Sequence, residues 1–499
     1  MQRFLFITIM IVLGIGGTTN AQPIVFNKVY DKDSTQNASS SIIETIGGGY
    51  LIAGTFSGGG NAGTWLIKIN DVGDTLWTKK YDFGLNNAYD LFELSNGNIL
   101  LCGTLHDTAT VTAKGYLMLV NAQGDSLWMQ QYGSGSGTNY DWATNIAQTP
   151  DGGFVISGFS WLAPNHTTSD VWIFKTDSLG NLLWQKQFDG YGRDDFFEKV
   201  IITPDGNIVC AGTTAFDGIT RLDYVVKMNQ QGDTLWTKQF GGLKWSELLD
   251  FNNTLDGGFI GCGARVVASG KQQASIFKLD SLGNVLWYNT FARGNGVGEY
   301  YNFSSVHELP NGNFMAAGVD YDYTQPVPGG STRIRMMEFN NSGDSIWSKQ
   351  YPHSTDEDED YVFDMKLTTD GGFIMCGYVI HSSPTRNDAL VIKIDSNRCD
   401  NVPCQLSVGV EETSNFKPQT SNFKVYPNPT TGILTIELKN ETIDKLIVEI
   451  YNLLGEKVYN GLVTQNSINI NHLNNGVYFL QLKDKNNKHL VTQKLMLQK

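Results

Sequence analysis

The chain of 499 residues is poor in several features that mark common classes of protein. Beyond its first residues, no segment is apolar over the length that crosses a bilayer, and no run has the 3.6-residue apolar period of an amphipathic helix. Lys and Arg number 36 against 50 Asp and Glu, which gives a net charge of −14 and leaves no cation-rich surface for nucleic-acid phosphates. The sequence therefore predicts no transmembrane span, no nucleic-acid partner and no helical repeats.

Catalytic and metal-binding signatures are also missing. The chain contains no HExxH, GxSxG, CxxC or P-loop pattern, and its seven His residues lack metal-ligand spacing. Residues 58–63 spell GxGxxG, but they join two expected strands with no helix after them, so the dinucleotide interpretation fails. We predict no cofactor and no metal. Calcium stays open, although no motif supports it.

The first residues have the pattern of an export signal. Arg3 precedes an apolar segment, residues 4–17, and Thr19 and Ala21 are small residues at the −3 and −1 positions of a cleavage site. We interpret residues 1–21 as a signal peptide that is removed from the mature protein. No Cys follows this site, so a lipoprotein anchor is not expected.

What the chain does contain is a repeat. A tight Asx-Gly or Gly-Gly hairpin recurs seven times, at Gly48, Asn96, Asp151, Asp205, Asp256, Asn311 and Asp370. A second turn follows in six copies and leads into a strand that begins Leu-Trp or Ile-Trp and carries a second aromatic residue four positions later. The Trp residues are Trp77, Trp128, Trp184, Trp236, Trp287 and Trp347. Because the spacing puts both aromatics on one face, it favours packing between neighbouring sheets over a sugar-stacking stripe.

Each copy is expected to hold four short strands. In the third copy we place them at residues 143–149, 154–158, 171–176 and 183–188. Four antiparallel strands at this period are typical of β-propeller blades. The seventh copy lacks its aromatic strand, and Phe26, Lys28 and Tyr30 near the N-terminus have the missing pattern. The predicted fold is all-β: a seven-bladed propeller over residues 22–404, closed by the N-terminal strand.

The six cysteines divide into two kinds. Cys399 and Cys404 are close together in a loop-like segment, which in an exported protein predicts a local disulfide, with two unpaired thiols as the alternative. The other four lie in the second strand of different repeats and are expected to be small buried residues without disulfides: Cys102, Cys210, Cys262 and Cys376.

The composition changes after Cys404. Residues 405–421 are polar and are interpreted as a linker, and residues 422–499 alternate like the strands of a small Ig-like β-sandwich. This last segment contains Tyr426-Pro427-Asn428-Pro429, the run Asn452-Leu453-Leu454-Gly455-Glu456-Lys457-Val458 and the run Gly476-Val477-Tyr478-Phe479-Leu480.

These motifs resemble the type A sorting domain of type IX secretion cargo. The resemblance implies export by the general secretory route, passage through the outer membrane by the type IX machinery, and release or attachment to surface polysaccharide. A permanent Ig-like binding module is the alternative. The repeats themselves resemble bacterial β-propeller repeats with a D-G-G/N hairpin, which implies a fold and little chemistry.

Candidate binding residues are sought on the face of the propeller that carries its longer loops. That face is expected to present an acidic run at residues 356–360 and six aromatic residues: Trp161, Tyr191, Trp245, Tyr300, Tyr321 and Tyr323. Such a mixture suits a glycan or a cation, and ordinary loop packing is the alternative. A polar position ten residues before each first hairpin includes Asp141, Asp195 and Asp360, which are expected near the channel mouth. They could bind a cation or act as acid and base, and turn capping is the alternative.

The sequence thus predicts a monomeric secreted or surface-attached propeller that acts in binding or adhesion without catalysis, with an extracellular glycan as partner. Two alternatives stay open. One is a polysaccharide-active hydrolase or lyase with carboxylates at the channel mouth, and the other is a structural component of the cell surface.

Overall fold

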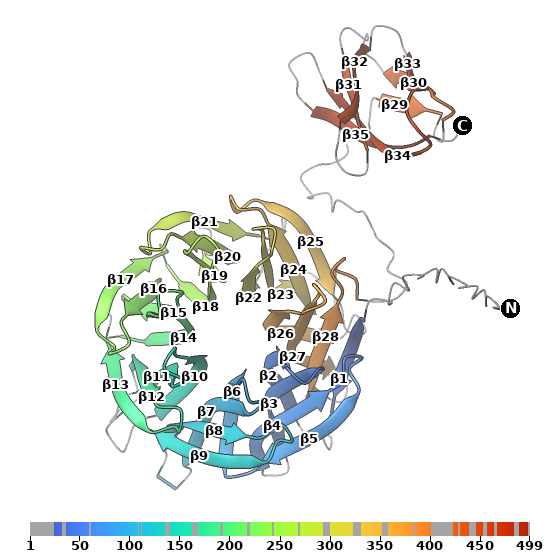
Figure 1. The fold of residues 1–499 in the computed structure, drawn as a ribbon. Helices are drawn as coiled ribbons and strands as arrows, with labels where there is room; N and C mark the ends of the chain where they lie inside the picture. Colours follow the sequence, from blue (N-terminus) through green and yellow to red (C-terminus); the bar gives the residue numbers. More distant parts are fainter. Residues whose placement is uncertain are drawn as a thin grey trace, which may run out of the picture. The chain divides into compact units, whose positions relative to one another are not determined.

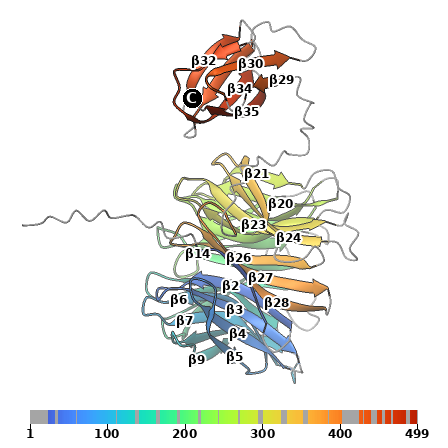
Figure 2. The same ribbon diagram turned by 90° about the vertical axis from the view of Figure 1, so that its right-hand side faces the viewer.

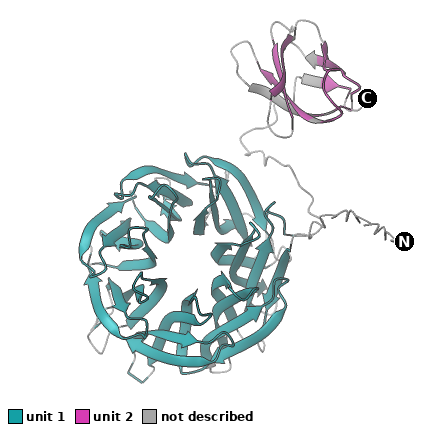
Figure 3. Cartoon of the chain, viewed as in Figure 1, with its two compact units in different colours: residues 1–410 teal, residues 411–499 magenta. Residues whose placement is uncertain are grey.

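The computed structural model describes most of the chain. The described residues are 24–31, 36–58, 61–107, 109–110, 112–134, 140–161, 168–189, 193–216, 220–241, 244–267, 270–292, 300–322, 331–351, 358–382, 385–400, 423–427, 430–438, 446–452, 457–463, 467–483 and 489–497. The chain divides into two compact units, Met1–Val410 and Glu411–Lys499 (Figure 3). The predicted signal peptide and linker lie outside the described residues. No described helix is long and apolar enough to cross a membrane.

The first unit is built from four-stranded antiparallel sheets, so the predicted all-β propeller class is confirmed. The first four sets are β2 (Gln36–Glu44), β3 (Tyr50–Gly58), β4 (Asn61–Ile69) and β5 (Thr75–Tyr81); β6 (Leu85–Glu93), β7 (Ile99–Asp107), β8 (Thr112–Val120) and β9 (Ser126–Tyr132); β10 (Tyr140–Gln148), β11 (Phe154–Trp161), β12 (Ser169–Thr176) and β13 (Leu182–Phe188); and β14 (Asp195–Ile202), β15 (Ile208–Ala215), β16 (Arg221–Met228) and β17 (Thr234–Phe240). The other three are β18 (Ser246–Asn253), β19 (Phe259–Val266), β20 (Gln272–Leu279) and β21 (Val285–Phe291); β22 (Tyr300–Glu308), β23 (Phe314–Asp322), β24 (Ser331–Phe339) and β25 (Ser345–Tyr351); and β26 (Glu359–Leu367), β27 (Phe373–Ser382) and β28 (Thr385–Ile394) with β1 (Phe26–Tyr30). We number these sets blade 1 to blade 7.

The blades form a ring. Figure 1 shows the first strand of each blade nearest the centre and the fourth strand at the rim, and Figure 2 views the same ring from its edge. The N-terminal strand closes the ring, because β1 pairs antiparallel with β28, with Phe26 opposite Lys393 and Tyr30 opposite Ala389. The apolar core lies between neighbouring blades, as where Trp65 of blade 1 belongs to one buried cluster with Val391 of blade 7. Burial of these sheet faces is the main favourable term of the fold.

The rim carries the same contact between one blade and the next. Where a tyrosine ends the fourth strand, it donates its hydroxyl to a carbonyl in the next blade's second turn: Tyr30 to Gly73, Tyr81 to Gly124 and Tyr132 to Gly180. Blades 3, 4 and 5 have Phe188, Phe240 and Phe291 at this position and therefore lack the bond. Lys79 of the same strand pairs with Asp125 at 2.8 Å. In blade 7 the glycine is replaced by Arg398, which adopts the required positive φ of 66° and accepts the Tyr351 hydroxyl. The predicted packing role of the rim aromatics is thus what the structure shows.

The inner strands share a second regular feature, a β-bulge. In blade 3, Thr144 is skipped in the pairing of β10 with β11, and the equivalent residue is skipped in every blade. The second strand has a glycine at this level. A Cβ on Gly158 would lie 1.8 Å from the carbonyl oxygen of Trp142, and the seven equivalent glycines all give distances of 1.8–2.1 Å to such an oxygen. The bulge therefore requires a residue without a side chain on the neighbouring strand.

The second unit holds two small sheets. The first has β29 (Phe423–Tyr426), β30 (Ile433–Leu438) and β33 (Ser467–Asn469), and the second has β32 (Lys457–Val463), β31 (Leu446–Tyr451), β34 (Gly476–Lys483) and β35 (His489–Leu497). Their apolar faces share one core that includes Ile436, Val448 and Leu480. Of the predicted sorting motif, Tyr426 is 41% exposed and is followed by Pro427, whereas Asn428, Pro429 and Gly455 lie outside the described residues.

The cysteines agree with the two kinds expected. Cys399 is disulfide-bonded, and its predicted partner Cys404 lies outside the described residues. The four repeat cysteines are buried free thiols: Cys102, Cys210, Cys262 and Cys376. Burial raises the pKa of each of these thiols, so they are not expected to act as nucleophiles.

Candidate functional site

The bulges decide which side chains line the centre of the ring. A regular strand alternates its side chains, but a bulge lets two consecutive residues point to the same side. Each inner strand therefore turns its bulged residue and the next residue toward the channel. The seven consecutive pairs are Ser40–Ser41, Tyr89–Asp90, Thr144–Asn145, Glu198–Lys199, Leu249–Asp250, Ser304–Ser305 and Phe363–Asp364.

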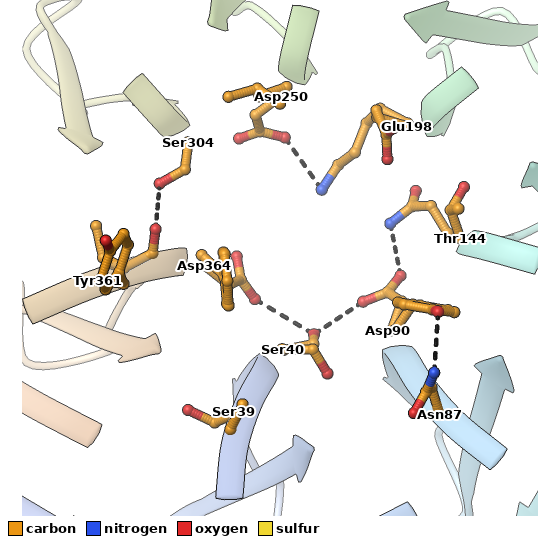
Figure 4. A pocket seen from close by; sticks show the side chains of 18 of the residues that line it. Ser39, Ser40, Asn87, Asp90, Thr144, Glu198, Asp250, Ser304, Tyr361 and Asp364 are labelled. Atoms are coloured by element: carbon orange, nitrogen blue, oxygen red, sulfur yellow. Dashed lines mark hydrogen bonds and ion pairs between the residues drawn. The ribbon is translucent and has the colours of Figure 1, made fainter. Parts of the chain in front are cut away.

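A cavity of about 780 Å³ fills the channel and is lined by residues of all seven inner strands. Figure 4 shows carboxylate, amide and hydroxyl side chains around the cavity, among them Asp90, Asp250 and Asp364. Its volume falls in the range of sites that hold small molecules or short segments of a polymer.

The residues that follow the bulges form a set that we call the polar belt; neighbouring members are hydrogen-bonded or ion-paired at several places, and all but Ser305 line the cavity. Its members, one from each blade, are Ser41, Asp90, Asn145, Lys199, Asp250, Ser305 and Asp364. Four of them accept a backbone N–H of the next blade: Asp90 from Ile146, Asn145 from Val200, Asp250 from Val306 and Asp364 from Ile42, at 2.9–3.1 Å. The belt therefore joins the blades at the channel and also gives the cavity its polar floor.

Two cations neutralise part of the belt. Lys199 lies 3.1 Å from Asp250, and Lys366 lies 2.7 Å from Asp364. Burial would raise the pKa of Asp250, but Lys199 outweighs it and holds that pKa at about 2. Burial raises the pKa of Asp90 despite the more distant Lys199 and Lys366. The belt thus lowers the pKa of Asp250 and raises the pKa of Asp90, although the two side chains are chemically identical.

Two further carboxylates face the cavity above the belt, Glu198 from β14 and Glu247 from β18. Burial, and then the charge of Glu247, raise the pKa of Glu198 to about 7. Burial also raises the pKa of Glu247, against the opposing effect of Arg221. Carboxyl groups with such raised pKa values gather at functional sites more often than elsewhere.

One wall of the cavity is aromatic and comes from blades 2, 3 and 4. The rings of Tyr89 and Trp142 stack with centroids 5.6 Å apart, and Trp142 stacks on Phe159 at 5.4 Å. Phe159 in turn meets the ring of Phe196 edge-on at 5.0 Å. These contacts hold the indole of Trp142 in a fixed orientation beside the cavity.

A second aromatic wall comes from blades 6 and 7, across the ring from blade 3. Tyr361 stacks on Tyr378 with centroids 4.7 Å apart, and Phe363 lies 5.4 Å from the same ring. Phe363 is 45% exposed although it is a large apolar residue that lines the cavity. The Tyr321 hydroxyl completes this wall by donating to Glu359 at 3.4 Å. The two walls lie at the loop end of the channel, where the inner strands begin and the second strands end.

The six predicted loop aromatics lie in different environments. Tyr321 lines the cavity, Trp161 is 41% exposed at the end of β11, and Trp245 is half-buried just before β18. Tyr300 begins β22, and nothing is described of its side chain. Tyr191 and Tyr323 lie outside the described residues, as do residues 356 and 357 of the acidic run at 356–360. The structure therefore brings Tyr321 to the cavity and leaves a binding role for the others as a prediction.

The predicted carboxylates Asp141, Asp195 and Asp360 are all buried and do not line the cavity. Side chains alternate along the inner strands, and these three lie on the side that faces neighbouring blades and not on the side that faces the channel. Asp141 accepts hydrogen bonds from the backbone N–H and the hydroxyl of Ser134, at 3.0 and 2.5 Å. This is the turn-capping role that the sequence left open as the alternative.

Sequence reasoning missed the polar belt. The signal was present, since a polar residue lies six positions before the start of the first hairpin in six copies, including Asp90, Asp250 and Asp364, and Ser41 lies seven positions before Gly48 in the remaining copy. Within the part of the chain that the structure describes, no three His, Cys, Asp or Glu residues are grouped so that they could hold a metal ion.

The fold and the site together define a β-propeller protein with a central cavity, followed by a small β-sandwich domain. Residues 424–498 match the family model of the secretion system C-terminal sorting domain, so the predicted resemblance is confirmed for this segment. The protein is therefore secreted or displayed at the cell surface, and it interacts with the type IX secretion machinery.

Two curated proteins are similar to parts of the chain. The endo-acting ulvan lyase of Formosa agariphila is 29% identical over 153 residues, which cover 30% of this chain and 26% of that protein. Ulvan lyase NLR42 of Nonlabens ulvanivorans is 38% identical over 73 residues, which cover 14% of this chain and 13% of that protein. The chain thus spans about a quarter and about an eighth of the length of these relatives.

Similar solved structures include the extracellular domain of the hybrid two-component system BT3049 from B. thetaiotaomicron. The match has a TM-score of 0.46 and 13% identity, and it covers 96% of this chain and 58% of that chain.

Proposed function

We propose that this protein is a secreted, non-catalytic propeller that binds an extracellular glycan in its central cavity. The observation that carries the proposal is the pairing of two aromatic walls, around Trp142 and around Tyr361 and Tyr378, with a polar belt beneath them. Sugar rings present apolar C–H faces that pack on aromatic rings, and their hydroxyls hydrogen-bond to carboxylates and amides. An export route to the cell exterior suits such a ligand.

The belt favours binding over chemistry. Asp250 and Asp364 are held by Lys199 and Lys366, and Asp90 accepts the Asn145 amide at 2.6 Å. Groups that are already bonded in this way offer fixed partners to sugar hydroxyls and are poorly placed to exchange protons.

The test is a panel of neutral, amino and acidic oligosaccharides presented to the full chain. We expect binding of at least one class, with a loss of more than about tenfold in affinity for Trp142→Ala because an aromatic platform is removed. Trp161→Ala is the matched control, since this Trp is exposed at the end of β11 and does not line the cavity. Loss of binding in Trp161→Ala with normal binding in Trp142→Ala would move the ligand to the loop surface.

A polysaccharide-active enzyme is the second candidate. It is favoured by Glu198, whose pKa of about 7 suits a general acid or base near neutral pH, and by the partial similarity to two ulvan lyases. Incubation of the full chain with a bound polysaccharide distinguishes the two functions. Release of new chain ends that is abolished in Glu198→Gln would establish catalysis, and an intact polymer after long incubation supports binding alone. A structural surface component would bind none of the glycans.

A further inference from the structure

Two acidic side chains of the central cavity have no bonded partner among the described residues, and Arg221 acts on one of them, Glu247, only through its charge. The belt carboxylates Asp90, Asp250 and Asp364 all have bonded partners. Glu198 and Glu247, by contrast, make no hydrogen bond or ion pair with any residue that the structure describes, although both line the cavity. Both side chains are half-buried, and removing part of the water from an ionised group without giving it a bonded partner is unfavourable, so two such groups on neighbouring blades are an unusual feature of a folded protein.

Among the described residues, no cation is paired with Glu198. Glu198 is the bulged residue of β14, and Glu247 faces it from β18. The phenol of Tyr89 lies near it on β6, and the neighbouring Lys199 is paired with Asp250. Arg221 acts on Glu247 and not on Glu198. Both carboxylates are therefore available to a positive group that enters with the ligand.

We propose that the glycan bound in this cavity carries a free amino group, and that its ammonium lies between Glu198 and Glu247. This inference rests on the proposed function and names the ligand class of the same site. An ammonium has three N–H donors, so it can serve two carboxylates at once. The wall formed by Tyr89 and Trp142 belongs to blades 2 and 3, next to β14, so a sugar ring stacked there would place a substituent toward Glu198. Sulfated or uronate sugars would instead meet like charge.

The test compares two ligands that differ in the amine alone. Tetrasaccharides of glucosamine and of N-acetylglucosamine share one backbone, and acetylation removes the positive charge. At pH 7 we expect the full chain to bind the glucosamine form about tenfold more tightly, as a charge-assisted hydrogen bond would give. The double variant Glu198→Gln/Glu247→Gln should lose this preference. Glu93→Gln should keep it, because Glu93 lies at the far end of β6 and contacts Ile46.

The outcomes separate this inference from the proposed function. Equal or tighter binding of the acetylated form, binding of uronate sugars alone, or a preference that survives in the double variant would overturn the amino-sugar inference and leave glycan binding standing. Failure to bind any neutral, amino or acidic oligosaccharide would contradict the proposed function itself. The comparison of ligands on the unmodified chain needs no variant, so it holds even if a substitution disturbs folding.

Discussion

The rim of the propeller and the wall of its channel follow opposite rules. At the rim, the hydroxyl-to-carbonyl bond of Tyr81 is repeated by Tyr30 and Tyr132, and Lys79 has its counterpart in Lys28 and Lys186. At the channel, every blade has the same bulge, but the bulged residue ranges from Ser40 to Tyr89 and Glu198.

The comparison teaches how a repeat protein separates fold from function. Where each blade must hold the next one, the same residues recur, because each interface poses the same packing problem. Where side chains face an open cavity, every blade has the same backbone geometry but a different side chain, because no packing contact with a neighbouring blade determines which residue is needed. Positions that share a backbone geometry and differ in chemistry are therefore the first place to look for a ligand.

The bulge sets which side chains face the channel, and its disruption should have the largest effect. In Gly158→Ala the new Cβ would lie 1.8 Å from the carbonyl oxygen of Trp142, so the backbone must shift. We expect a loss of about 4 kcal/mol in unfolding free energy, measured by urea denaturation of the full chain. Gly47→Ala is the control, because nothing lies within 4 Å of its new Cβ. Equal stabilities of the two variants would show that the bulge is dispensable.

A charge at the channel should matter more than a charge at the rim. Lys199→Met leaves Asp250 buried without its cation, which should cost about 3 kcal/mol at pH 7. Because the native pKa of Asp250 is about 2, below its ordinary value of 3.8, this stabilisation is present above pH 4 and is lost as the pH falls toward 2. The penalty of the variant should therefore shrink in acid.

The matched rim variant is Lys79→Met. Its ion pair with Asp125 is exposed, with 41% and 61% of the two side chains accessible, so the expected cost is below about 0.5 kcal/mol. A cost comparable to that of Lys199→Met would remove the distinction between the two regions.

Glu198 should oppose folding at the pH where it serves binding. Burial and the charge of Glu247 raise its pKa from 4.5 to about 7, so folded-state stability falls as the pH rises from 4.5 to 7. Glu198→Gln cannot ionise and should be more stable than the unmodified chain by about 2 kcal/mol at pH 8, with no gain at pH 4. Thermal unfolding at the two pH values checks this. A gain of the same size at both would mean that ionisation is not the cause.

A modest effect is expected from the loss of one hydrogen bond of the repeated rim. Tyr132→Phe removes the hydroxyl that donates to Gly180 at 2.6 Å, at a cost of about 1 kcal/mol. Because the rim contacts are equivalent, Tyr30→Phe should cost the same within about 0.5 kcal/mol, measured by the same denaturation experiment. Unequal costs would show that the rim is less uniform than its sequence.

The sequence foretold the rim better than the channel for a physical reason. Asx-Gly turns and alternating aromatics are local signals, so the blades and the closing strand could be placed from spacing alone. The channel depends on the phase of the inner strands, and the bulge at Thr144 and its equivalents reverses that phase midway. Asp141 and Asp195 were selected by their distance from the first hairpin, which does not fix the direction of a side chain, and Asp90 and Asp250 beyond the bulge were passed over. Tyr321 was selected as an aromatic residue of the longer-loop face, and it lines the cavity.

The pairing of β1 with β28 also sets an order of events during export. Phe26 meets Lys393, so the ring cannot close until the chain is present as far as Lys393. The earlier blades contain their own hairpins and can form as the chain emerges, whereas the last blade must wait for a strand that was the first to arrive. Until then the outer edge of β28 is unpaired, and β1 stays without its partner strand for longer than any other strand of the propeller. The ring can therefore close only when the whole propeller is present.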